Sequence, residues 1–135
     1  MPRFAALLPL IVVVACSPAE PEAASESWAA GRDGLCLTGG GAGLRAGLIV
    51  YGEGDANCSL TGSASREGDI IRITPTGDPQ CSVEVALSGG GARIGQRIEA
   101  CNYYCGPGAD FSGRNLHRSD RPATSVTDLA GDPIC

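Results

Sequence analysis

The chain has no lysine, a single histidine and very few aromatic side chains, which number six among 135 residues. Its ten basic residues are all arginine, and no stretch gathers them into a stripe that could neutralise a run of phosphates. The formal net charge is −5. These features argue against nucleic-acid binding and equally against electrostatic attachment to an anionic lipid surface.

Residue patterns typical of catalysis are also missing. No two carboxylates are placed for acid–base work, and His117, with Ser112, Ser119 and Asp120 nearby, belongs to no nucleophile pattern of a hydrolase. We interpret residues 114–121 as a solvated polar loop. The sequence therefore predicts that the protein is not an enzyme and that it has no catalytic residue, no resident cofactor and no metal site.

One apolar run stands near the start of the chain. It extends over residues 4–15, is interrupted only by Pro9 and follows Arg3. A helix that spans a membrane needs about 20 apolar residues, so this run is too short, and its length is typical of an export signal.

The run ends in Val13-Val14-Ala15-Cys16, and this motif resembles the lipobox of bacterial lipoproteins. The resemblance implies cleavage before Cys16 and acyl chains on Cys16, which would anchor the protein in a membrane. In that family an Asp after the cysteine often marks retention at the inner membrane, and this chain has Ser17 there. We therefore predict an outer-membrane protein, lipid-anchored and facing the periplasm. The alternative is an ordinary cleaved signal in which Cys16 is incidental.

Composition divides the chain into three parts: a signal peptide at 1–15, the lipidated Cys16 with a flexible tether at 16–33, and a small β domain with a C-terminal extension at 34–135. The tether is rich in Pro, Glu, Ala and Ser, which bury too little apolar area to become ordered. Trp28 is the exception, and we expect it to be where the chain first docks onto the domain.

Beyond Cys36 the hydrophobic period is two, which is typical of β-strands. Inward positions are predicted at Cys58, Leu60, Gly62 and Ala64, at Ile71 and Ile73, at Cys81, Val83, Val85 and Leu87, and at Ile94 and Ile98. Residues 48–51 are more continuously apolar and indicate a strand covered on both faces. Short strands with tight turns between them predict a mainly β fold, an antiparallel meander that closes into a barrel or sandwich. At most one short helix, from Ser125, is expected near the end.

Six cysteines remain after Cys16, and an even number in a small exported domain indicates disulfides. These candidates are Cys36, Cys58, Cys81, Cys101, Cys105 and Cys135. Six cysteines allow fifteen pairings, among which the sequence does not choose. As a working hypothesis we pair Cys36 with Cys58, Cys81 with Cys101, and Cys105 with Cys135.

The segment Cys101-Asn-Tyr-Tyr-Cys105 allows two further interpretations. Tyr103 and Tyr104 could form a recognition patch on a disulfide-braced turn, with at least one of them in the core. Alternatively, Cys101 and Cys105 with His117 could form a periplasmic metal-binding or thiol-redox site, as in copper-delivery proteins.

The sequence therefore favours a non-catalytic binding or structural module of the cell envelope. Its size and layout resemble those of periplasmic lysozyme-inhibitor lipoproteins, although their Ser-Gly-x-x-Tyr type of signature is absent. This resemblance implies an inhibitor-like class of role, with an envelope protein or a glycan as the partner.

Overall fold

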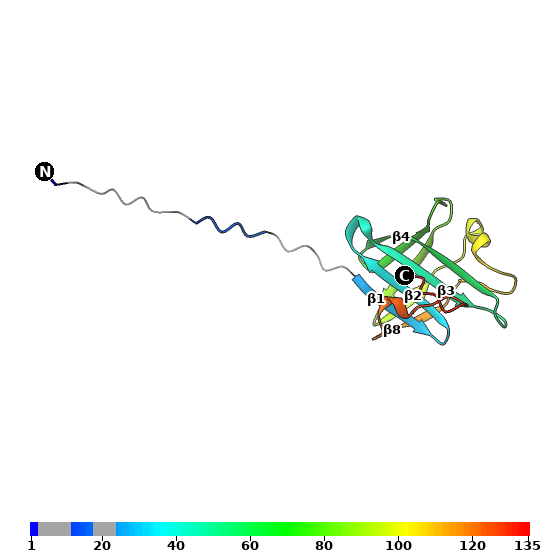
Figure 1. The fold of residues 1–135 in the computed structure, drawn as a ribbon. Helices are drawn as coiled ribbons and strands as arrows, with labels where there is room; N and C mark the ends of the chain where they lie inside the picture. Colours follow the sequence, from blue (N-terminus) through cyan, green and yellow to red (C-terminus); the bar gives the residue numbers. More distant parts are fainter. Residues whose placement is uncertain (3–11, 18–23) are drawn as a thin grey trace.

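A computed structural model of the protein describes residues 1–2, 12–17 and 24–135. Most of the apolar run and the tether residues 18–23 lie outside the described residues, as do the predictions made for them. Residues 24–119 form an antiparallel barrel of eight strands (Figure 1). Each strand pairs with the next along the chain, and β8 pairs back to β1. The predicted mainly β, antiparallel fold is confirmed, and its closed form is a barrel.

The strands are β1 (Ala24–Ala30), β2 (Asp33–Gly39), β3 (Arg45–Tyr51), β4 (Asn57–Glu67), β5 (Ile70–Pro75), β6 (Val83–Ser88), β7 (Gly91–Ile94) and β8 (Asn115–Ser119). The helical segments of the described chain are the 3-10 turns η1 (Gly41–Gly43), η2 (Glu99–Tyr104) and η3 (Ala123–Ser125). No helix in these described parts is long and apolar enough to cross a membrane.

Inward-facing side chains fill the barrel. The alternation predicted from sequence is confirmed in β4, β5 and β6, where residues such as Leu60, Ile73 and Val85 are buried and their neighbours along the strand face outward. Phe111, from the connection between β7 and β8, is fully buried in the same cluster. An eight-stranded barrel has an interior just wide enough for side chains. The interior of the barrel is therefore occupied by the protein's own side chains.

The boundary of the domain differs from the prediction. Residues 24–30 form β1 and not the second half of a flexible tether. β1 pairs with β2 on one side and with β8 on the other, and Trp28 points inward and is 3% exposed. The prediction from composition is wrong here because the backbone hydrogen bonds of a strand that closes a barrel stabilise even a polar segment. The one large apolar side chain of the segment, Trp28, packs in the core.

The last segment, residues 120–135, lies against the outside of β2 and β3 and is here termed the strap. Val126 packs over Gly34 and Ile134 over Gly47, where a Cβ atom would come within 2.6 and 2.9 Å of these side chains. Both glycines leave room for the strap. It covers Ile49, which confirms that residues 48–51 are buried on both faces. Where at most one short helix is expected from Ser125, the described chain has only the 3-10 turn η3, because Val126 leaves this turn to pack on the barrel.

All six candidate cysteines form disulfides, but only Cys81–Cys101 follows the working hypothesis. The other bridges are Cys36–Cys135 and Cys58–Cys105, so the pairings of Cys36 with Cys58 and of Cys105 with Cys135 are wrong. Cys36 faces outward, beneath the strap, whereas Cys58 faces the interior. A barrel wall separates the two sulfurs, and a disulfide needs Cα atoms within about 7 Å.

The position of Cys36–Cys135 predicts a separable strap. Replacing both residues by Ala should lower the free energy of unfolding by about 2–5 kcal/mol, since the bridge closes a loop across 99 residues. The far-UV circular dichroism of the barrel should remain, while limited proteolysis should cut within residues 120–135. The matched control is the double Ala variant of Cys58 and Cys105, which should loosen the barrel itself. Loss of the β spectrum on opening Cys36–Cys135 alone would contradict the prediction.

Candidate functional site

The 3-10 turn η2 is a surface segment that two disulfides hold in place. It belongs to the connection between β7 and β8, and it is held by two bridges, Cys81–Cys101 and Cys58–Cys105. Cys58 and Cys105 also form an isolated backbone bridge, so the end of the turn is attached to the start of β4. Because Cys58, Cys81 and Cys101 are fully buried, the turn is fastened directly to the core.

The two tyrosines of this turn have different environments. The ring of Tyr104 packs against the core, and its hydroxyl donates a hydrogen bond to Asp78 Oδ2 at 3.0 Å. Burial, and then this bond, raise the pKa of the Tyr104 phenol above its usual value. Tyr103 is 88% exposed and meets Tyr104 edge to face, with ring centroids 5.2 Å apart. Tyr104 therefore supports Tyr103, which points into solvent.

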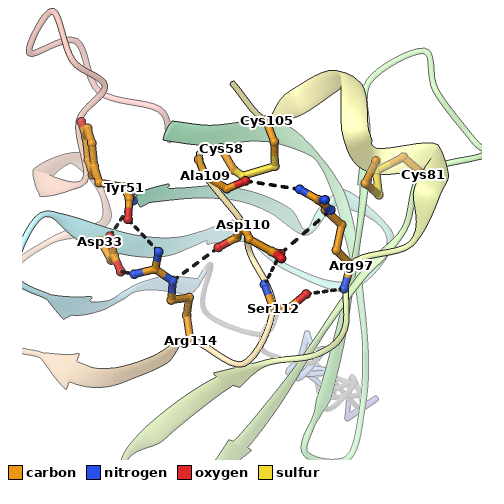
Figure 2. Close-up of a disulfide and its surroundings, with 11 residues drawn as sticks. Asp33, Tyr51, Cys58, Cys81, Arg97, Cys105, Ala109, Asp110, Ser112 and Arg114 are labelled. Carbon is orange, nitrogen blue, oxygen red and sulfur yellow. Dashed lines mark hydrogen bonds and ion pairs between the residues drawn. A yellow bond between two sulfur atoms is a disulfide. The ribbon is translucent and has the colours of Figure 1, made fainter. Parts of the chain in front are cut away.

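A charged network holds the same connection against β2 and β3 (Figure 2). Arg114 donates to Asp33 Oδ2 at 3.2 Å and to the carbonyl oxygen of Tyr51 at 2.7 Å. Asp33 in turn accepts the backbone N–H of Tyr51 at 2.8 Å. Arg97 donates to the carbonyl oxygen of Ala109 at 3.2 Å. These charged side chains form hydrogen bonds with backbone groups and with each other, so their role is structural.

Asp110 completes this network. The backbone N–H of Ser112 donates to its carboxylate at 2.8 Å. This bond, helped by the Ser112 hydroxyl and by Arg97 and Arg114, holds the pKa of Asp110 below its usual range. The carboxylate thus stays charged in the folded protein at mildly acidic pH.

A second ionic cluster lies at the opposite end of the barrel, where β1 begins. Arg118 and Arg66 both pair with Glu26, at 2.6 and 3.5 Å. The guanidinium of Arg118 also lies 4.9 Å from the centre of the Trp28 ring. The cluster covers Trp28 at this end of the barrel, and its two arginines share the single carboxylate of Glu26, which leaves a net charge of +1.

The strap forms one side of a groove of about 530 Å³ on the outside of the barrel. The other side comes from β1 and the turn after it. Arg32 lies there over the ring of Tyr51, at 4.0 Å, and is also paired with Asp55. Leu129, from the strap, is 56% exposed at the groove. This mixed lining shows no set of groups converging on one ligand.

The structure separates the residues of the predicted metal or redox site. Cys101 and Cys105 are each in a disulfide, to different partners, so neither sulfur is available as a thiolate ligand in this structure. His117 is exposed on the outward face of β8, away from the core cluster that holds Cys101. Among the residues described, no three His, Cys, Asp or Glu side chains form a group suited to a metal ion.

Sequence reasoning missed several residues. The segment interpreted as a solvated polar loop contains β8, with Leu116 fully buried. Ile98, predicted to face inward, is 42% exposed because β7 ends at Ile94. Nothing in the sequence indicated that Arg114 pairs with Asp33, since 81 residues separate them. A period-two pattern does not reveal where a short strand ends or which charges meet across the barrel.

Comparison of the chain with protein-family models, with curated proteins and with solved structures finds no match.

Removal of the Arg114 side chain tests its structural role. Arg114→Ala should lower the free energy of unfolding by about 1–3 kcal/mol, because Asp33 and the Tyr51 carbonyl lose a charged, half-buried donor. The matched control is Arg93→Ala, since Arg93 is exposed on β7 and forms no hydrogen bond or ion pair with a described residue. Urea unfolding of both variants checks this. Equal stability of the two would show that Arg114 contributes nothing.

The lowered pKa of Asp110 predicts a pH dependence. A carboxylate whose folded pKa lies below its unfolded pKa stabilises the fold above the unfolded value, and this stabilisation is lost as the pH falls through the folded pKa. Asp110→Asn should therefore flatten the fall in stability below about pH 4. Urea unfolding across the acidic range measures the slope. An unchanged slope would contradict the assignment.

Proposed function

We propose that the protein is a lipid-anchored, non-catalytic binding module of the bacterial outer membrane, attached through acyl chains on Cys16 and facing the periplasm. All seven cysteines lie within the described residues, and Cys16 is the one that forms no disulfide. It is exposed, and it follows the apolar run at the position where a lipobox has its lipidated cysteine. This division of the cysteines is the observation that carries the proposal.

The construction of the domain supports a binding role. Three disulfides brace a domain of little more than a hundred residues, a size at which the core alone gives limited stability. The filled barrel leaves the outer surface for recognition. A rigid scaffold of this kind can present a surface group without the entropy cost of ordering it on binding. The partner would be an envelope protein or a glycan.

Substitution of Cys16 tests the anchor. In the native host, Cys16→Ser should remove the acyl mass from the mature protein and move it from the membrane fraction to the soluble fraction. Two acyl chains, at about 0.8 kcal/mol per buried methylene, account for stable attachment. Intact mass and membrane fractionation measure both effects. Recovery of the wild-type mature protein without acyl chains would refute the anchor.

Ser17→Asp is the matched control for location. It retains Cys16, and by the resemblance to lipoproteins it should hold the acylated protein at the inner membrane. Separation of inner and outer membranes on a sucrose gradient distinguishes the two variants. If the wild type already sediments with the inner membrane, the outer-membrane assignment is wrong.

A further inference from the structure

The two ends of the barrel differ in their relation to the start of the chain. The near end is where β1 begins at Ala24, and the far end is where β1 ends. The far end carries the connections at residues 31–32, 52–56, 76–82 and 95–114. η2 belongs to the last of these, so it lies opposite the start of β1. Figure 1 shows the chain reaching β1 on one side of the barrel and η2, in yellow, on the other.

The length of the tether then determines which end faces away from the membrane. This step depends on the proposed acylation of Cys16. Seven residues separate Cys16 from Ala24, and the eight steps between these two Cα atoms span at most about 29 Å when fully extended. The near end is therefore held close to the membrane. The far end, with η2, is the one presented to the periplasm.

The far end exposes an aromatic side chain on a rigid support. Tyr103 is 88% exposed and Ile98, beside the turn, is 42% exposed. Tyr104, fixed by its bond to Asp78, supports the ring of Tyr103. Exposed tyrosines on rigid turns are typical binding hot spots, because the side chain offers a large contact area with few rotatable bonds.

The charge of the far end indicates the kind of partner. Its connections and the adjoining Asp33 carry six carboxylates but only three arginines. Each arginine is already paired, as Arg32 with Asp55, Arg97 with Asp110, and Arg114 with Asp33. Glu53 and Glu99, in contrast, form no ion pair with any described residue. Glu99 belongs to η2 itself, so negative potential adjoins the exposed ring.

We propose that the far end is a docking surface for a basic protein of the periplasm, with Tyr103 as its anchor. The partner presents a pocket for the Tyr103 ring and Ile98, surrounded by lysine or arginine side chains that face Glu99 and Glu53. Complementary charge accelerates the encounter, and the buried ring slows dissociation. The inference deepens the proposed function and rests on it for the orientation.

Site-specific photo-crosslinking in the native host tests the surface on the full-length chain. A photoreactive amino acid replaces Tyr103, and in a control it replaces Thr61, which is exposed on β4. We expect an adduct from position 103 and not from position 61, with a protein that mass spectrometry identifies and whose net charge is positive at neutral pH. An adduct with an acidic protein, with a glycan or with a second copy of this chain would overturn the proposal, as would equal adducts from both positions.

Variants of Tyr103 and Glu99 supply a second measurement. With the photoreactive residue moved to the exposed Asn102, Tyr103→Ala should reduce the adduct at least tenfold, whereas Tyr103→Phe should retain it within about threefold. Glu99→Arg should also reduce the adduct, through charge repulsion. Unchanged yield in both Tyr103→Ala and Glu99→Arg would refute the docking surface. Thermal unfolding of each variant checks that the exposed substitutions leave the fold intact.

Membrane fractionation of the same cells separates the two proposals. Acylated, membrane-bound protein that forms no adduct from position 103 refutes the docking surface and leaves the lipid anchor standing. Unacylated protein in the soluble fraction refutes the anchor, and with it the orientation on which the docking surface depends.

Discussion

Pairing between β1 and β8 is the interaction on which the rest of the structure depends. These strands are more than eighty residues apart in sequence, and their backbone bonds turn an open meander into a closed barrel. Closure removes the exposed sheet edges, which would otherwise pair with other chains. It also divides every strand into an inward and an outward face. Trp28, on the closing strand, fills the interior at the same place.

The role of each disulfide depends on which face of the barrel wall it lies on. Cys58–Cys105 and Cys81–Cys101 have buried sulfurs in the core cluster and fasten η2 to it. Cys36–Cys135 lies on the other side of the wall and holds the strap. One pair of strands thus carries a second, smaller apolar layer on its outer face. Gly34 and Gly47 make this layer possible, because a side chain at either position would displace the strap.

The stabilising contacts are concentrated at the far end of the barrel, opposite the start of β1. Two disulfides, the bond between Tyr104 and Asp78, and the contacts of Arg114 all act on the single long connection between β7 and β8. Long connections are usually the mobile part of a small domain. Here the connection is fixed at several points while Tyr103 remains outside the packing. The stabilising contacts thus hold this connection in place and leave the Tyr103 side chain exposed at its surface.

The class of fold, the use of six cysteines in disulfides and the inward residues of β4, β5 and β6 could all be predicted from the sequence. These properties depend on local alternation and on composition, which are visible along the chain. The strand at residues 24–30, the choice of cysteine partners and the exposure of Ile98 and Tyr103 could not be predicted in this way. They depend on barrel closure, because closure brings together residues far apart in sequence and places each on one face of the wall. Arg114 meets Asp33, and Cys36 meets Cys135, only after the sheet has closed.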